Sequence, residues 1–138
     1  MEKAIQNILA NDSNLQGVIE DTGWGGGGTK YKIYHLVADG TVDVPYVTYQ
    51  RINTDPHDTK DGVSGLDVCM LDVDIWADNN SDLFTIAGYV RTALDRKAEG
   101  TYNGETLQSI RFMDHRTDVE ERVGVYHLTL VFSVREKR

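Results

Sequence analysis

The feature that most constrains the fold is the alternation of side chains along residues 68–76. One set of alternate residues is apolar and comprises Cys69, Leu71, Val73 and Ile75. The other set comprises Met70, Asp72, Asp74 and Trp76. Because successive side chains of a β-strand point to opposite faces of the sheet, the stretch predicts a strand with one core face. The second face carries two carboxylates and is a candidate interface surface.

Two further segments supply partners for that core face. Residues 126–134 alternate in the same way and predict a long final strand. Residues 81–97 predict a helix, because Ser81 suits the N-cap position and an apolar stripe follows at helical spacing. The core expected where this helix packs on the sheet consists of Leu71, Val73, Ile75, Ile86, Val90, Leu94, Leu128, Leu130 and Phe132.

The first part of the chain predicts a helix, a loop and a hairpin. Apolar residues at helical spacing in 4–9 predict a short first helix. The glycine run 25–28 has too much backbone entropy for a regular element and predicts a flexible loop. Residues 31–37 and 42–52 are rich in β-branched and aromatic side chains and flank an Asp-Gly pair. This pattern is typical of a β-hairpin.

The remaining segments predict two connections and one more strand. Residues 53–67 are polar, contain proline and glycine, and predict a long loop. Loops of that length in a compact domain are often functional, so this one is a candidate partner-contact segment. Residues 106–113 predict a strand, and the charged residues 115–122 predict a connection. The candidate contact residues of the long loop are Asp55, His57, Asp58, Lys60 and Asp61.

These elements occur in the order α-β-β-β-α-β-β. The order favours an α+β fold in which a mostly antiparallel sheet of about five strands is packed by two helices. A chain of 138 residues is expected to form a single domain, here residues 1–138, with a core that needs neither metal nor disulfides.

Composition argues against several function classes. With 14 basic and 22 acidic residues, the formal net charge is −8, which disfavours tight binding to the phosphates of nucleic acids. Cys69 is the only cysteine, so no intramolecular disulfide forms and folding in a reducing cytoplasm is expected. No signal peptide and no apolar run of the roughly 20 residues needed to span a bilayer is expected, so no membrane partner is predicted.

Candidate cofactor and metal motifs fail on their context. Residues 23–28 formally match G-x-G-x-x-G, but a helix precedes them and a strand follows, the reverse of a phosphate-binding turn. A calcium loop beginning at His57 would have a histidine as its first ligand and Val68 at its last position. The histidines lack paired spacing, so no zinc site is expected. Neither a cofactor nor a metal is predicted.

Two other functional hypotheses remain from the residues themselves. Asp72 and Asp74, with Asp78 and His115 as candidate neighbours, would be the catalytic group of a small carboxylate-based hydrolase or nuclease. Alternating carboxylates on a strand are far more common as a solvated surface, and no nucleophile has an identifiable base. The other hypothesis is a monomeric binding module that uses the 53–67 segment.

Short motifs in a consistent order resemble the small tail-completion or tail terminator proteins of long-tailed phages and prophages, which are related in fold to the tail terminators of lambda-like phages. The resemblance covers residues 3–134, and it departs from the family at the glycine run 25–28, where relatives have a shorter connection that contains proline. The motifs are Pro45-Tyr46-Val47, Tyr49-Gln50-Arg51-Ile52, Gly65-Leu66-Asp67, Val73-Asp74-Ile75-Trp76-Ala77-Asp78, Ala87, Val90-Arg91, Ala93-Leu94, Ile110-Arg111, Tyr126-His127-Leu128 and Phe132.

The resemblance implies a structural role rather than catalysis. Members of this family are expected to form a hexameric ring that caps the finished tail tube and then joins the head-completion or stopper protein. DNA passes through the centre of such a ring without specific recognition, so the resemblance makes the strand face with Met70, Asp72, Asp74 and Trp76 a candidate lumen or interface surface. The resemblance implies no cofactor and no catalytic residue, and it places the protein in the virion tail after assembly in the host cytoplasm.

Overall fold

The computed structural model describes residues 1–21, 25–26, 28–38, 43–59, 62–120 and 124–137. Three helices and six strands follow one another within these residues. One sheet contains all six strands in the order β1-β2-β3-β6-β5-β4. The elements are α1 (Glu2–Ala10), α2 (Ser13–Ile19), β1 (Ile33–His35), β2 (Tyr46–Thr59), β3 (Gly62–Ala77), α3 (Asn80–Leu94), β4 (Gly100–Tyr102), β5 (Glu105–Glu120) and β6 (Val125–Lys137).

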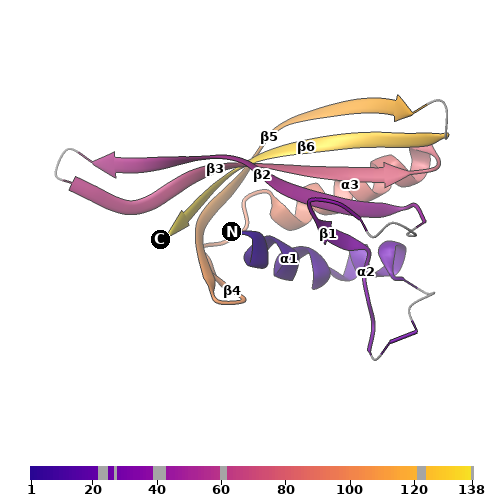
Figure 1. The fold of residues 1–138 in the computed structure, drawn as a ribbon, viewed down its shortest axis with the longest axis horizontal. Helices are drawn as coiled ribbons and strands as arrows, with labels where there is room; N and C mark the ends of the chain where they lie inside the picture. The colour runs from indigo at the N-terminus through magenta and orange to yellow at the C-terminus, as the bar shows by residue number, and fades with distance from the viewer. Residues whose placement is uncertain (22–24, 27, 39–42, 60–61, 121–123, 138) are drawn as a thin grey trace.

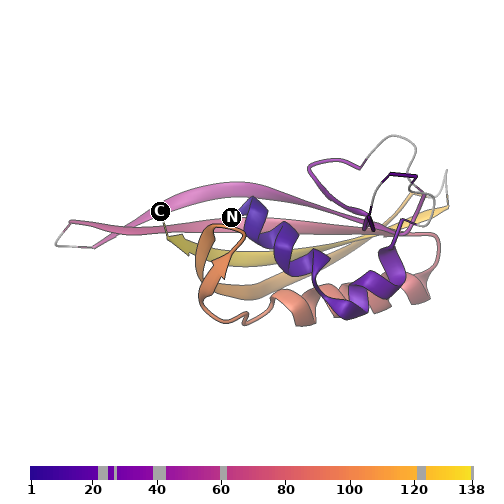
Figure 2. The same cartoon turned by 90° about the horizontal axis from the view of Figure 1, so that it is seen from below.

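The helices lie on one side of the sheet (Figures 1 and 2). β3 and β6 pair at the centre in an antiparallel register that places Ile75 opposite Leu128 and Leu71 opposite Phe132. Their alternate apolar side chains point toward the helices, as the sequence pattern predicts. Every residue of the expected core is buried, so that prediction is confirmed. No helix among the described residues has the length and apolar character needed to cross a membrane.

The α+β class is confirmed, but the expected strand arrangement is wrong in its first part. β1 pairs with β2 in a parallel direction, with Ile33 opposite Val47, so the two segments do not form a hairpin. Alternation and turn-forming residues indicate strands without giving the direction in which they pair. The expected Asp39-Gly40 turn lies outside the described residues.

Two segments expected to be connections are strands. β2 and β3 continue through residues 53–67 and remain paired as far as Thr59 and Gly62, with register shifts on the way. β5 likewise continues through most of residues 115–122 and pairs with β6 down to Glu120 opposite Val125. These predictions failed because backbone hydrogen bonds hold the two ribbons together, and such bonds leave no apolar pattern in the sequence.

The helices differ from expectation mainly at their ends. α3 is capped by Asn79, whose Oδ1 accepts the backbone N–H of Asp82 at 2.8 Å, and not by Ser81. It ends at Leu94 rather than near residue 97. The polar residues that were expected to end the first helix instead start another one, because Asp12 Oδ2 accepts the N–H of Leu15 at 3.0 Å.

Truncation of the core should destabilise the protein strongly. Ile75 and Leu94 are fully buried, so replacing either by alanine removes apolar contacts and leaves a cavity. We expect Ile75→Ala and Leu94→Ala each to lower the free energy of unfolding by about 2–5 kcal/mol in urea titrations. Ile52→Ala is the control, because Ile52 is half exposed. A loss below about 0.5 kcal/mol for both core variants would contradict this packing.

Candidate assembly surfaces

The predicted lumen or interface residues lie together on the side of the sheet opposite the helices. Met70, Asp72, Asp74 and Trp76 are all half-buried there, flanked by β2 and β6. We call this side the open face, because no helix of the described chain covers it (Figure 2). The β6 residues paired directly with the four are Ser133, Val131, Thr129 and His127.

Asp74 is the centre of the polar contacts on the open face. Its Oδ1 accepts a hydrogen bond from the Thr129 hydroxyl at 2.6 Å and lies 2.7 Å from His127 Nε2. The His127 ring stacks on the Trp76 indole, with centroids 4.0 Å apart and an interplanar angle of 5°. Tyr46 continues the stack on β2, 6.0 Å from Trp76. The open face therefore has a rigid aromatic end next to a fixed carboxylate.

The pKa values of the two carboxylates on the open face are shifted in opposite directions. Burial raises the pKa of Asp72, and the neighbouring charge of Asp74 adds to the effect, while Arg116 at 3.8 Å offsets it. Burial also opposes ionisation of Asp74, but the hydrogen bonds from His127 and Thr129 outweigh it and lower the pKa of Asp74. Asp74 is consequently held as an anion at neutral pH.

This geometry differs from that of a nucleophile relay. In such a relay the histidine lies between the hydroxyl and the carboxylate and uses its two different nitrogens. Here His127 Nε2 faces both Asp74 and Thr129, at 2.7 and 3.2 Å, and the hydroxyl of Thr129 donates to Asp74. The hydroxyl proton is thus donated in a hydrogen bond to the carboxylate and does not point to His127.

The other residues proposed for a catalytic group do not join the two aspartates. His115 lies on the helix side, where it borders a groove beside α3. Asp78 is exposed at the start of α3 and accepts a hydrogen bond from Asn79. No group of three or more potential metal-binding side chains occurs among the described residues. The sequence missed His127, although its position in the alternation of the final strand would have placed it on the open face.

Three of the five predicted partner-contact residues belong to β2, in the β2–β3 hairpin. We call residues 53–67 the arm, which extends away from the helices at the end of the sheet (Figure 1). Asp55 is exposed, and the backbone of His57 and Asp58 belongs to β2. Lys60 and Asp61 lie outside the described residues. The arm is acidic in sequence, because it contains four aspartates and one lysine.

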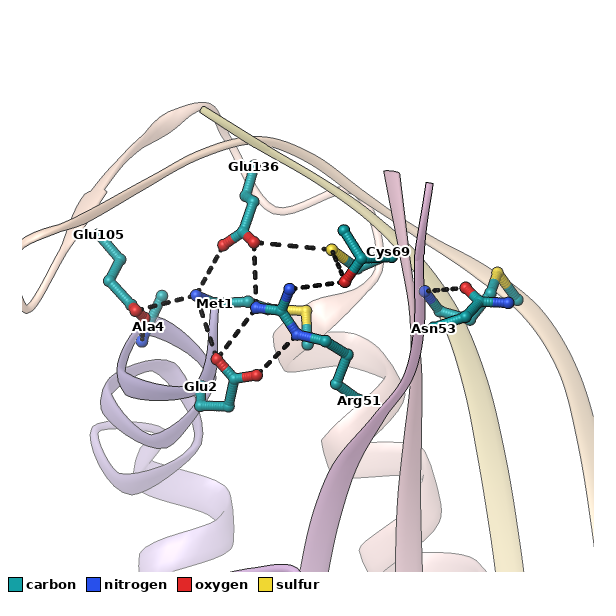
Figure 3. Close-up of polar contacts among 10 residues, drawn as sticks. Met1, Glu2, Ala4, Arg51, Asn53, Cys69, Glu105 and Glu136 are labelled. Carbon is teal, nitrogen blue, oxygen red and sulfur yellow. Dashed lines mark hydrogen bonds and ion pairs between the residues drawn. The ribbon is translucent and has the colours of Figure 1, made fainter. Parts of the chain in front are cut away.

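A network of charges lies at the root of the arm (Figure 3). Arg51 donates from Nε to Glu2 Oε1 at 2.8 Å and from one Nη to Glu136 Oε1 at 3.0 Å. A second Nη donates to the Thr54 hydroxyl at 2.8 Å. The α-ammonium group of Met1 lies 2.7 Å from Glu136. The network joins α1, β2 and β6 at the position where the arm leaves the sheet.

Further contacts complete this network. Glu105 of β5 lies 2.9 Å from the Met1 ammonium and accepts the backbone N–H of Ala4 at 2.8 Å. Burial lowers the pKa of the Met1 ammonium, but its bonds to Glu136 and Glu105 outweigh burial and leave that pKa raised. Sequence reasoning missed this network because its members are far apart along the chain and none belongs to a recognisable motif.

The network should make the free energy of unfolding depend on pH in the acidic range. Burial raises the pKa of Glu2, but the Arg51 hydrogen bond outweighs it and lowers this pKa from 4.5 to about 2. A carboxyl group with a lowered folded-state pKa contributes stability that is present above pH 4.5 and is lost as the pH falls toward 2. Glu2→Gln should therefore cost at most about 1 kcal/mol at pH 7, because the pair is partly solvated.

The difference between the wild type and Glu2→Gln should shrink between pH 4.5 and 2 in urea titrations. Glu99→Gln serves as the control, because Glu99 pairs with Lys137 where both side chains are about half exposed. A gap that stays constant down to pH 2 would show that Glu2 gains no stability from the network.

Comparison with known proteins assigns the fold and the family. The chain matches the family model described as "Tail completion protein gp17" over residues 3–137. No curated protein matches it. Among solved structures, it is similar to a chain of "Virion of native gene transfer agent (GTA) particle", with a TM-score of 0.77 and 18% identity over 100% of this chain and 95% of that chain. At that identity the likeness shows a common fold. The family match covers nearly the whole sequence, and the chain therefore belongs to the gp17 family of phage tail completion proteins, which are structural proteins of the virion.

Proposed function

We propose that the chain is a non-enzymatic ring subunit that ends the tail and joins it to the head. Copies of the chain form a hexameric ring that caps the tail tube, contacts the head-completion or stopper protein, and lets DNA pass through its centre. The ring belongs to the virion tail and assembles in the host cytoplasm. Membership of the tail completion family supports a structural role in the tail.

The observation that carries the proposal is the arm. A paired ribbon that extends beyond the helices and has few apolar residues gains little from burial of its own, and its exposed residues include Asp55. Such a ribbon contributes little to the stability of one subunit, but it provides reach toward a neighbouring protein. We assign the contact with the tail tube or head-completion protein to Asp55, His57, Asp58, Lys60 and Asp61.

The charge network fits this role because it fixes the direction of the arm. Arg51 is the last β2 residue before the register shift and is held by Glu2 and Glu136. An arm anchored to α1 and β6 at its root meets a partner in a fixed orientation. Pre-organisation of this kind lowers the entropy that binding costs.

The open face fits the wall of a DNA channel. Asp74 is kept anionic by its hydrogen bonds, and Asp72 adds a second carboxylate two residues away. In a chain with a net charge of −8, such a wall repels phosphates and limits adhesion of passing DNA. Trp76 and His127 stiffen the same face by stacking on each other, and the exposed Arg116 beside Asp72 offsets part of its negative charge.

The hydrolase hypothesis predicts turnover that depends on these two carboxylates, whereas the structural role predicts no turnover. An Asp72→Asn, Asp74→Asn variant removes both charges, and the wild type and the variant should be equally inactive toward DNA and phosphate esters. Thr129→Ala is the matched control, since it removes a hydrogen bond on the same face and keeps both carboxylates. Turnover by the wild type that disappears in the double variant and persists in Thr129→Ala would establish a hydrolase and contradict the structural role.

Shortening the arm should separate folding from assembly. Replacing residues 58–65 with Asn-Gly closes the hairpin on His57 and Leu66, which are directly paired, and leaves the pairing of Leu66 with Lys137 intact. We expect normal folding, with an unfolding free energy within about 1 kcal/mol of wild type. We expect a loss of terminated tails and joined heads, counted by electron microscopy after complementation.

The control replaces Asn103-Gly104 by Asp-Gly in the short β4–β5 turn, which alters a hairpin outside the arm. Normal numbers of infectious particles from the shortened variant would show that the arm is a passive connection.

A further inference from the structure

An apolar groove on the helix side of the sheet is not used by the contacts described so far. It lies between α3 and the strands β5 and β6. Its lining combines aromatic and aliphatic side chains with one guanidinium group, and includes Phe84, Gly88, Arg91, Phe112, Leu128 and Leu130. Phe84 is 55% exposed, although it is one of the largest apolar residues of the chain. A large exposed aromatic beside an open apolar groove is typical of a protein-binding surface.

Gly88 points to the same use of the groove. It lies inside α3, where glycine is less favourable than alanine because it costs more backbone entropy. A Cβ atom at this position would meet nothing within 4 Å, so packing within the described chain does not require glycine. Gly88 follows Phe84 by one helical turn, and because it has no side chain the groove stays open beside Phe84. The missing side chain would let the backbone of another molecule approach α3 closely.

A complementary apolar projection lies directly after β1. Leu36 and Val37 are consecutive and are 56% and 76% exposed. Leu36 has a φ of 72°, a conformation that is unfavourable for a branched side chain. The backbone is held there because the Leu36 N–H donates to the Tyr49 carbonyl at 2.9 Å. The chain thus holds two apolar side chains out toward solvent in a defined position.

The groove and the projection lie toward opposite edges of the sheet. β1 is the first strand in the sheet order, whereas β5 and β4 are the last two, as Figure 1 allows the reader to follow. Two different surfaces on opposite sides of one subunit are what a head-to-tail contact requires. Such a contact generates a closed ring when the rotation between neighbours closes.

Each of the two surfaces has a charged side chain that forms no ion pair among the described residues. The guanidinium group of Arg91 lies 3.9 Å from the centre of the Phe112 ring, and no carboxylate of the described residues forms an ion pair with it. Asp43 is exposed on the β1 side, where its backbone carbonyl accepts a hydrogen bond from Lys32 at 3.2 Å. A neighbour that presents the β1 edge to the groove would bring an acidic group toward an unpaired arginine.

We propose that Leu36 and Val37 of one copy insert into the Phe84–Phe112 groove of the next copy, and that this contact links the subunits of the ring. The inference rests on the proposed ring and specifies its subunit contact. Burial of three large apolar side chains per contact would supply the attraction, and the unpaired arginine would orient it.

Two single variants test the contact. Val37→Asp blocks the projection and leaves the groove intact, whereas Phe84→Asp blocks the groove and leaves the projection intact. Both residues are exposed, so each variant should keep the circular dichroism spectrum and unfolding midpoint of the wild type. Val18→Asp is the matched control, because Val18 is an exposed apolar residue of α2 that belongs neither to the lining of the groove nor to the projection. Val37→Ser and Phe84→Ser replace the aspartate variants if either of these fails to fold.

The readout is the mass of the assemblies by native mass spectrometry, with and without the tail tube protein. The wild type and Val18→Asp should form the ring, and each blocked variant should lose at least about tenfold of the assembled fraction, because a carboxylate would be buried in an apolar groove. An equimolar mixture of isotope-labelled Val37→Asp with unlabelled Phe84→Asp retains one intact groove and one intact projection. The mixture should therefore stop at a one-to-one dimer.

Each other outcome overturns a defined part of the account. Rings formed by both blocked variants would show that the subunits meet elsewhere, while the ring itself would stand. Two blocked variants that give no dimer on mixing would show that the groove and the projection do not face each other. A wild type that stays monomeric even with the tail tube protein would overturn the ring, and this contact with it.

Discussion

The fold depends on the antiparallel pairing of β3 with β6 at the centre of the sheet. The register sets Ile75 against Leu128, Val73 against Leu130 and Leu71 against Phe132, so the apolar side chains of both strands reach the same face. Burial of that face against the helices supplies the main stabilisation, since apolar area removed from water is the largest favourable contribution to folding. The same register sends Asp72, Asp74, His127 and Thr129 to the other face, and a slip of one residue would exchange the two.

The functional surfaces arise where the central pairing continues without a covering layer. On the open face, Asp74 remains ionised between His127 and Thr129. Beyond the helices, β2 and β3 continue as a ribbon held by backbone hydrogen bonds and anchored by Arg51. A subunit built in this way keeps its stability in one half and offers the other half for contact. That division suits a protein of the tail completion family, whose members act within an assembly.

The sequence predicted those parts of the fold in which burial imposes a period. The alternation of residues 68–76 and 126–134 placed the core strands and the open face correctly, and the stripe from Leu83 to Leu94 placed α3. The extensions of β2 and β5 were missed because their composition is that of a loop, and residues 53–56 and 113–117 are exposed. The charge network and the contact of His127 with Asp74 could not be predicted, because they depend on which distant strands become neighbours. The direction of β1 was missed for the same reason.

The central claim is that copies of this chain surround the end of the tail tube as a ring with the open face turned inward. The most direct test is a reconstruction by electron cryomicroscopy of the head–tail junction in assembled particles. The account predicts six copies of the 15.5 kDa chain in one layer, with Asp72 and Asp74 lining the channel and the arms contacting the tube or the head-completion protein. A chain located away from the channel, or a layer whose open faces point outward, would contradict it.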